Sequence, residues 1–340
     1  MNERLEVETR KLTDSWMRHE ADWLRDYLVG SVEDPRLNVQ SILTRHFLID
    51  ALTPENHAPL MEAELRFAIC LTWLLKQIEL GAGPEDFSAI HHGLRVGSDN
   101  AEGLHLPEYL GETFAQQPAA DAPPAGSTYL NSVLVRLAQS PEPTLRGAPE
   151  LDGFMEAWRT ILAPLEPTGV AVLEPACGSA NDYRAIAACG LGELIHYHGF
   201  DLCIKNVANA RTMHPDTRFD VGNVFAIPAN ACAYDLLIAH DLFEHLSPEG
   251  LEQAIREVCR VTRNELCVGF FNMHEEGWTV VREVEDYHWN TLDAGNTRAL
   301  FEAAGFDVQI VSIDAFLRQA FRCKDQHNPR AYTFRCRRPE

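Results

Sequence analysis

Acidic side chains, a glycine and a histidine follow apolar runs in the second half of this sequence, where they could bind a ligand. The first run, residues 170–173, ends at Glu174 and leads into a turn of small residues with Gly178 near its centre. A short, bounded apolar run is typical of a strand that is buried on both faces. Small residues after such a strand let a ligand approach the backbone, so this is a candidate nucleotide-binding turn.

A second strand is predicted within residues 196–203 and ends at a second acid, Asp201. This acid follows Glu174 at about the distance at which a ribose-binding acid is expected. A carboxylate can accept hydrogen bonds from both ribose hydroxyls, which a neutral side chain does less well. A dinucleotide-binding turn is less well supported, because its G-x-G-x-x-G pattern needs glycines where Ala176 and Ala180 stand. An ordinary strand-to-helix turn is the remaining alternative.

A series of motifs over residues 165–315 resembles the class I S-adenosylmethionine-dependent methyltransferase superfamily. The turn from Glu174 resembles its acid-x-G-x-G-x-G motif I, with alanines at two glycine positions, which cost little unless a positive φ is needed. Residues 218–228 resemble its G-D-x-x-x-L-P adenine motif with Asn223 replacing the acid, and residues 234–248 resemble its motif IV. The resemblance implies S-adenosylmethionine as the cofactor.

The same resemblance implies a set of cofactor contacts around these motifs. These contacts would come from the turn, from the ends of the following strands, and from a helix at 127–140 that would close over the methionine end of the cofactor. The residues are Glu174, Ala176, Gly178, Asp201, Leu202, Asn223, Val224, His240, Tyr183, Tyr129 and Asn131. For the last two residues, packing and helix capping are equal alternatives. Tyr183 is also interpretable as a packing residue.

His245 is the candidate general base, because imidazole titrates near neutral pH and DLFEHL places it just after the fourth strand. Asp241 at the strand end would line the reactive end of the cofactor, and Tyr287 in the insertion 273–292 would shape the acceptor pocket. Alternatively, His245 orients a substrate, braces the next helix, or holds a metal with Glu244. One Glu-His pair makes no metal site, so no metal is predicted.

The order of apolar runs predicts an α/β fold, a doubly wound, mostly parallel sheet with an antiparallel last strand. Together with an N-terminal all-helical cap, this is the Rossmann-like arrangement that the methyltransferase resemblance implies. The last two strands, 306–313 and 331–337, are predicted to pair antiparallel at one edge, since no long crossover helix is apparent between them.

Two domains are predicted, a cap over residues 1–126 and a catalytic domain over residues 127–340. The Pro- and Ala-rich stretch 115–127 reads as the linker between them. The apolar stripes of the helical part need a partner surface, so the cap would serve as a lid or as a dimerisation element in a homodimer.

Composition restricts the class of partner. A formal net charge of −21 without a basic stripe argues against a nucleic-acid substrate. The charged start of the chain lacks the apolar core of a signal peptide, and no apolar run is long enough to span a bilayer, so a cytoplasmic protein without a membrane role is expected. Nine cysteines without C-x-x-C pairs are expected to be mostly buried free thiols.

Three functions are consistent with these features. The first is methyl transfer from S-adenosylmethionine to a small organic molecule. The second is attack on the aminobutyryl carbon of the cofactor, either by an acceptor or by the cofactor's own amino group closing a four-membered ring, with release of methylthioadenosine. The third is a non-catalytic protein that binds S-adenosylmethionine.

Overall fold

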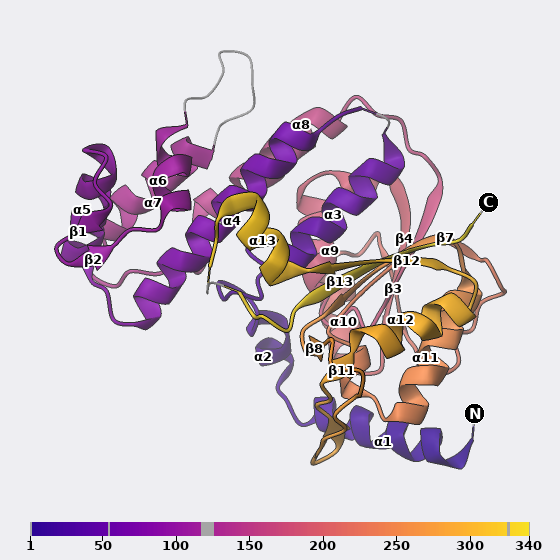
Figure 1. Ribbon diagram of the computed structural model, residues 1–340. Helices are drawn as coiled ribbons and strands as arrows, with labels where there is room; N and C mark the ends of the chain where they lie inside the picture. Colours follow the sequence, from indigo (N-terminus) through magenta and orange to yellow (C-terminus); the bar gives the residue numbers. More distant parts are fainter. Residues whose placement is uncertain (1, 54, 117–125, 325–326, 340) are drawn as a thin grey trace.

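The computed structural model describes residues 2–53, 55–116, 126–324 and 327–339, which form a central sheet, helices on both of its faces and a helical extension at one end (Figure 1). The strands of the central sheet are β3 (Val170–Pro175), β4 (Ile195–Asp201), β5 (Arg218–Val221), β6 (Tyr234–His240), β7 (Thr262–Phe270), β12 (Asp307–Ser312) and β13 (Tyr332–Arg337). Short strands outside it are β1 (Asn100–Ala101), β2 (Leu104–His105), β8 (Met273–His274), β9 (Glu283–Val284), β10 (Tyr287–His288) and β11 (Leu292–Asp293).

The helices alternate with the strands of the second half and fill most of the first half. They are α1 (Glu3–Met17), α2 (Ala21–Asp26), α3 (Val39–Leu52), α4 (Ala58–Glu79), α5 (Pro84–Arg95), α6 (Glu108–Ala115), α7 (Gly126–Gln139), α8 (Gly153–Leu162), α9 (Asn181–Ala188), α10 (Ile204–Met213), α11 (Pro248–Val261), α12 (Ala294–Ala303) and α13 (Ile313–Phe321).

The strand order in the sheet is β12-β13-β7-β6-β3-β4-β5. The strands from β7 to β5 are parallel to one another, whereas β13 is antiparallel to both of its neighbours. The predicted sheet, including the antiparallel pair at one edge, is therefore confirmed. The strand order reverses next to β3, since β4 and β5 follow on one side of it and β6 and β7 on the other. A ligand crevice is therefore expected at the carboxyl ends of β3, β4 and β6. The short helix α13 between β12 and β13 was not predicted.

Alternating side chains of the central strands pack into two separate cores. Val172 of β3 contributes to the core under α8 and α9, whereas the next residue, Leu173, contributes to the core under α11 and α12. Leu236 and Leu237 of β6 divide in the same way. Successive side chains of a strand point to opposite faces of the sheet. A sheet that is covered by helices on both faces therefore needs apolar residues at successive positions.

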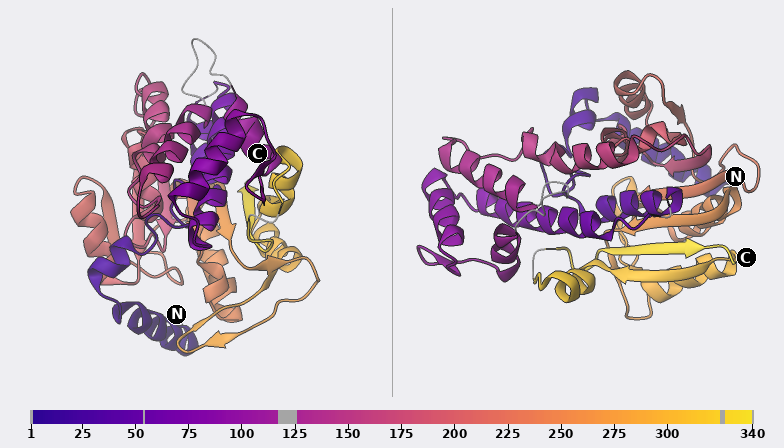
Figure 2. Two further views of the ribbon diagram at one scale, coloured as in Figure 1. Left: turned by 90° about the vertical axis from the view of Figure 1, so that its left-hand side faces the viewer. Right: turned by 90° about the horizontal axis from the view of Figure 1, so that it is seen from above.

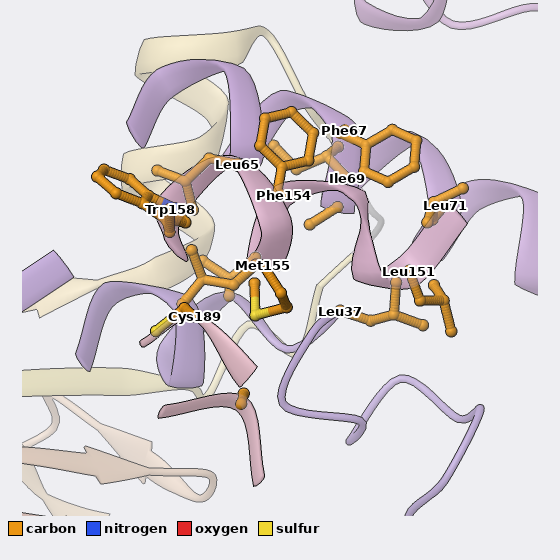
Figure 3. Packing of buried hydrophobic residues seen from close by; sticks show 14 of the residues in the cluster. Leu37, Leu65, Phe67, Ile69, Leu71, Leu151, Phe154, Met155, Trp158 and Cys189 are labelled. Atoms are coloured by element: carbon orange, nitrogen blue, oxygen red, sulfur yellow. The ribbon is translucent and has the colours of Figure 1, made fainter. Parts of the chain in front are cut away.

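The helical extension is built around the 22-residue helix α4, against which α6 and α7 pack, while α5 packs against α7. Figure 3 shows its core, in which side chains of α4 meet Phe154 and Trp158 of α8. Because α7 packs against helices on the other side of residue 126, the packing is continuous across the predicted boundary at 126/127, which stays a prediction. Most of the predicted linker, residues 117–125, lies outside the described residues.

The first two helices lie apart from this extension and cross the carboxyl edge of the sheet (Figures 1 and 2). We call residues 3–26 the N-terminal strap. Leu5 and Leu12 on one face of α1 pack into the core of α11 and α12. The Glu8 carboxylate accepts hydrogen bonds from the Ser247 backbone amide and hydroxyl, both over 2.6 Å, at the start of α11. The strap therefore covers the edge at which a ligand crevice is expected.

Candidate functional site

The turn after β3 has a strained backbone. Ala176, Gly178 and Ala180 have φ angles of 55°, 55° and 66°, all in the left-handed region. This is the condition under which alanine is costly, by roughly 1–2 kcal/mol for each residue. The Cys177 amide donates to the Phe200 carbonyl over 3.1 Å and ties the turn to β4. Strain of this kind persists only where the surrounding structure enforces it, and it concentrates at ligand-binding sites.

The structure brings Asp201, at the end of β4, directly to this turn. One carboxylate oxygen accepts a hydrogen bond from the Gly178 amide over 3.1 Å. The other oxygen accepts from the Cys203 amide over 2.7 Å and from the Asn206 side chain over 3.2 Å, at the start of α10. Burial raises the pKa of the Asp201 carboxyl, although these three donors favour its charged form.

The arrangement leaves Asp201 able to accept a further hydrogen bond, and its contact with a ribose stays a prediction. A carboxylate offers about four acceptor positions, and the three donors around Asp201 leave one of them for a ligand hydroxyl. The backbone of the turn is lined by Ala176 and Gly178, so no large side chain stands between it and a ligand.

The other motif I acid, Glu174, is buried beneath the turn and accepts a hydrogen bond from the Tyr197 hydroxyl. Burial, followed by the charge of Asp182, raises the pKa of Glu174 well above its ordinary value. Its contact with a cofactor stays a prediction, as do those of Ala176 and Leu202, which are half-buried.

Asn223 and Val224, in the predicted adenine loop, lie under the N-terminal strap. The Asn223 amide nitrogen donates to the Thr9 hydroxyl over 2.9 Å, and its side-chain oxygen accepts from the Phe225 amide over 2.9 Å. Val224 is buried in the core beside the strap residues Leu5 and Leu12. The strap therefore packs on this loop, and the adenine contact itself stays a prediction.

His240, at the end of β6, is held between two helices. Its Nδ1 lies 2.7 Å from the Asp182 carboxylate of α9, and its Nε2 lies 2.9 Å from the Thr44 hydroxyl of α3. Burial alone would lower the pKa of His240, but the charge and hydrogen bond of Asp182 raise it. Gly269 of β7 makes room for the ring, since a Cβ atom there would lie 2.3 Å from His240 Cδ2.

Asp241 and His245 form an ion pair in the loop after β6. Asp241 has a φ of 48° and its carboxylate lies 3.0 Å from His245 Nε2, while His245 Nδ1 lies 3.2 Å from the His288 carbonyl. Because both partners are acceptors, both ring nitrogens carry a proton and the imidazole is a cation.

The titration of His245 differs from the expected one. Burial would lower the pKa of its imidazolium, but the hydrogen bond and charge of Asp241 reverse this, and with smaller effects from Glu244 and His288 they raise the pKa to about 9. This pKa is higher than the near-neutral titration that the sequence predicts for His245. Its catalytic role, and that of Asp241, stays a prediction.

Aromatic rings and a buried acid surround this ion pair. The ring centroids of Tyr287 and Trp289 lie 5.6 Å and 5.0 Å from that of His245. Glu244 is fully buried, and one of its oxygens accepts a hydrogen bond from the Phe271 amide over 2.6 Å. The other oxygen has no hydrogen-bond partner among the described residues. Burial and the charge of Asp241 raise the pKa of Glu244 to about 7.

Sequence interpretation missed two residues that face the same site, Tyr27 and Glu33, both between α2 and α3. Burial among protein groups raises the pKa of Tyr27, with further contributions from the charges of Asp241, Glu33 and Asp201. The charges at two strand ends, those of Asp241 and Asp201, therefore both act on Tyr27. Its ring stacks on Trp23 at a centroid distance of 4.7 Å. No local pattern signals this position, because a loop from outside the motif region supplies it.

Three predicted contacts have partners elsewhere. The Tyr129 hydroxyl donates to the Gly153 carbonyl over 3.0 Å, and the Asn131 side-chain oxygen lies 2.9 Å from His91 Nε2, so both belong to the packing of the helical extension. The Tyr183 ring is buried, and its hydroxyl lies 2.8 Å from that of Thr217. These contacts are structural, and a further contact of any of the three with the cofactor stays a prediction.

Other features carry no additional site. No group of three or more His, Cys, Asp and Glu side chains among the described residues could hold a metal ion. Among the helices of the described ranges, none combines the length and the apolar character that crossing a membrane requires. A cavity of about 600 Å³ lies at the opposite, amino end of the strands, where Arg263 pairs with Asp235 and Arg337 with Glu265.

Comparison with known proteins places a domain on the motif region. Residues 172–265 match the model of a family described as a methyltransferase domain. This segment contains the turn after β3, Asp201, Asn223 and the Asp241–His245 pair. No curated protein sequence matches the chain.

Solved structures resemble about half of the chain. Magnesium protoporphyrin IX methyltransferase from Synechocystis PCC 6803, with bound SAM, is 14% identical, with 55% of this chain and 79% of that chain covered and a TM-score of 0.38. An SAM-dependent methyltransferase from Methanosarcina mazei is 14% identical, with 52% of this chain and 96% of that chain covered and a TM-score of 0.38. The YcgJ protein from Bacillus subtilis is 13% identical, with 54% of this chain and 98% of that chain covered and a TM-score of 0.36. The family match shows that residues 172–265, which contain the motif series, are of the methyltransferase-domain type.

Proposed function

We propose that the protein binds S-adenosylmethionine at the carboxyl ends of β3, β4 and β6 and transfers its methyl group to a small organic molecule. The observation that carries this proposal is the Asp201 carboxylate, which is bonded to the Gly178 amide and keeps one acceptor position for a ribose hydroxyl. When bound, S-adenosylmethionine supplies a sulfonium group whose carbon substituents are electrophilic. The protein's part is to hold a nucleophile in line with the reacting carbon and to exclude water.

The surroundings support a small acceptor. The N-terminal strap lies over the loops after β4, β5 and β6. It is also held by the helix α10, from which Lys205 donates to the Met17 carbonyl over 2.8 Å and Asn209 donates to the Ala21 carbonyl over 2.7 Å. A site covered in this way suits a small molecule better than a polymer. The net charge of −21 also opposes a nucleic-acid acceptor.

Chemistry at the aminobutyryl carbon is a second candidate, and the cover over the site favours it. A site closed by residues 3–26 can act on the cofactor alone, without a path for a separate acceptor. The cofactor's own amino group would then be the nucleophile. A non-catalytic binding protein is the third alternative.

Product analysis tests these functions. The purified protein is incubated with S-adenosylmethionine, first alone and then with candidate acceptors. Formation of S-adenosylhomocysteine supports methyl transfer, formation of methylthioadenosine supports the aminobutyryl chemistry, and binding without either product supports the non-catalytic alternative. Absence of binding would contradict all three.

Replacing Asp201 with asparagine should weaken S-adenosylmethionine binding by about 1.5–3 kcal/mol, because a hydrogen bond to a charged group is lost. An asparagine also cannot accept from all of the donors that surround the present carboxylate. Isothermal titration calorimetry measures the affinity, and circular dichroism checks the fold. Asp216→Asn, at an exposed position, is the matched control and should bind normally. Unchanged affinity in a folded Asp201→Asn variant would remove this residue from the site.

S-Adenosylmethionine should also slow hydrogen exchange in the N-terminal strap, because the strap lies over the loops that would contact the ligand. Hydrogen-exchange mass spectrometry with and without the ligand measures this protection. Residues 84–115 of the helical extension provide the internal control, and their exchange should not change. Protection confined to residues 165–245, with none before residue 140, would show that the N-terminal helices do not cover the bound ligand.

A further inference from the structure

We propose that Asn290 positions the Asp241–His245 pair, and that Asp241 is the member of the pair that meets the ligand, by accepting a hydrogen bond from the amino group of S-adenosylmethionine. This inference rests on the proposed function, because it needs the cofactor at the carboxyl ends of β3, β4 and β6. Asn290 lies in the insertion 273–292, which follows the segment that matches the methyltransferase domain.

Asn290 is buried and binds the backbone on both sides of His245. Its backbone amide donates to the Glu244 carbonyl over 2.9 Å. Its side-chain amide nitrogen donates to the Leu246 carbonyl over 2.7 Å. Because Glu244 and Leu246 are the residues directly before and after His245, this one asparagine fixes the backbone that carries the imidazole.

The remaining polar groups of Asn290 are also bonded. Its side-chain oxygen accepts a hydrogen bond from the Arg282 amide over 3.1 Å, within the insertion. Its carbonyl accepts one from the Asn272 side chain over 2.8 Å, just after the end of β7. The asparagine is only 1% exposed, so water does not compete for these groups. Asn290 is therefore held in one orientation between the insertion and the loop after β6.

The residues just before Asn290 surround the imidazole itself. His245 Nδ1 lies 3.2 Å from the His288 carbonyl. The ring centroids of Tyr287 and Trp289 lie 5.6 Å and 5.0 Å from that of His245. With its ring held in this way, His245 presents Nε2 to Asp241 Oδ1 over 3.0 Å. The orientation of the Asp241 carboxylate thus depends on the insertion that Asn290 anchors.

Asp241 carries the oxygen of this pair that is open to a ligand. Both nitrogens of His245 are already bonded, so the imidazole has no donor or acceptor left. The Asp241 side chain is 49% exposed, and its Oδ2 has no hydrogen-bond partner among the residues that the structure describes. Its φ of 48° is strained, and strain of this kind concentrates at ligand-binding sites.

The sheet order indicates which group of the cofactor would reach Asp241. Asp201, which would hold the ribose, ends β4, and the predicted adenine loop follows β5 on the far side of β4. Asp241 follows β6, on the opposite side of β3. A cofactor whose adenosine lies over β4 and β5 extends its amino-acid end towards β6. The ammonium of that end is a cationic N–H donor, and a carboxylate is its strongest acceptor.

The titration of His245 reports whether Asn290 holds the pair. The charged groups that act on this imidazolium are Asp241 and Glu244, and the His288 carbonyl adds a hydrogen bond. Asn290→Ala should loosen the contacts with Asp241 and His288, so the His245 midpoint in an NMR titration should fall by about 0.5–1 pH unit. A loss of global stability alone would not move a midpoint measured in the folded protein.

Two ligands that share the adenosine group test the contact of Asp241. S-Adenosylhomocysteine carries the amino-acid end, with its ammonium and carboxylate, whereas methylthioadenosine lacks it. Calorimetry should show that Asp241→Asn weakens S-adenosylhomocysteine by about ten- to a hundredfold, because a hydrogen bond between charged groups is lost. Methylthioadenosine should stay within about twofold of its wild-type affinity. The ligand carboxylate cannot explain such a loss, since removing a negative charge from the protein would favour its binding.

A double-mutant cycle tests whether Asn290 acts through Asp241. Asn290→Ala should weaken S-adenosylhomocysteine by about three- to tenfold, and it should add no further loss when Asp241→Asn is already present. Asn296→Ala is the matched control, because it removes a side-chain bond to the Gly277 carbonyl of the same insertion, and it should change neither the affinity nor the His245 midpoint. If circular dichroism shows that Asn290→Ala does not fold, Asn290→Ser replaces it, since a serine side chain is too short to bridge to the Leu246 carbonyl.

Three results would overturn the inference. Unchanged binding of S-adenosylhomocysteine to Asp241→Asn, or equal weakening of both ligands, would exclude the contact with the amino group. Equal losses from Asn290→Ala with and without Asp241→Asn, or an unchanged His245 midpoint, would show that Asn290 only stabilises the insertion. Failure of the wild-type protein to bind either ligand would instead contradict the proposed function, and the His245 midpoints, which need no ligand, would still test the role of Asn290.

Discussion

Replacing Glu64 with alanine is expected to lower the free energy of unfolding by about 3–5 kcal/mol, because it leaves a buried charge without its partner. The Glu64 carboxylate binds Arg45 over 2.5 Å, His46 over 2.8 Å and the Trp158 indole over 2.7 Å, so it joins α3, α4 and α8. Glu64 and Arg45 are each only 2% exposed.

Urea unfolding followed by circular dichroism measures this loss. Glu62→Ala is the matched control on the same helix, since Glu62 makes an exposed ion pair with Arg66 that should contribute no more than about 1 kcal/mol. A loss below about 1 kcal/mol for Glu64→Ala would show that the buried network does not hold the helices together.

The same network should make the protein sensitive to acid. Burial would raise the pKa of Glu64, but the charge of Arg45 and the bonds of His46 and Trp158 lower it to about 2. A lowered carboxyl pKa stabilises the fold above the ordinary value of 4.5, and this contribution is lost as the pH falls towards 2.

The second large effect concerns His245, which should make the protein less stable as the pH rises from 6.5 to 9. Its pKa is raised from 6.5 to about 9 in the folded protein, so its contribution is complete below 6.5 and is lost as the pH passes through 9. The shift corresponds to at most about 3 kcal/mol, at 1.36 kcal/mol for each pKa unit. Unfolding measured across this range should show the loss in the wild type and not in His245→Gln.

A direct titration completes this test. The ring protons of His245 in an NMR titration should show a midpoint near 9. His196→Gln, at an exposed position on β4, should leave the pH dependence of stability unchanged. A midpoint for His245 at or below 6.5 would return it to the role of a neutral base.

The sheet could be predicted from sequence because its information is local. Apolar runs such as 170–173, each followed by a polar turn, determine a buried parallel strand almost without reference to the rest of the chain. The contact between Gly178 and Asp201 also follows from this pattern, since carboxyl ends of neighbouring parallel strands meet at one edge. The nine-residue helix α13 escaped prediction because a helix this short does not stand out as a crossover in the segment between β12 and β13.

The chemistry of the site was harder to predict, because it depends on groups that meet only in three dimensions. The sequence around His245 is that of an ordinary histidine, and its raised pKa comes from the Asp241 carboxylate and the His288 carbonyl. Glu33 lies far from every motif in the sequence, and its carboxylate is held by the Asn38 side chain that caps α3. Likewise, Ala176 and Ala180 look unstrained until their φ angles are known.

The N-terminal strap has a consequence for biosynthesis. Its contacts join residues far apart in the chain, since Thr9 bonds Asn223 and Glu8 bonds Ser247, at separations of 214 and 239 residues. During translation the strap leaves the ribosome before its docking surface, which is complete only after residue 247 has emerged. Nascent chains therefore keep Leu5 and Leu12 exposed until the sheet has formed, and chaperones that recognise apolar helices would have most of the synthesis time in which to bind them.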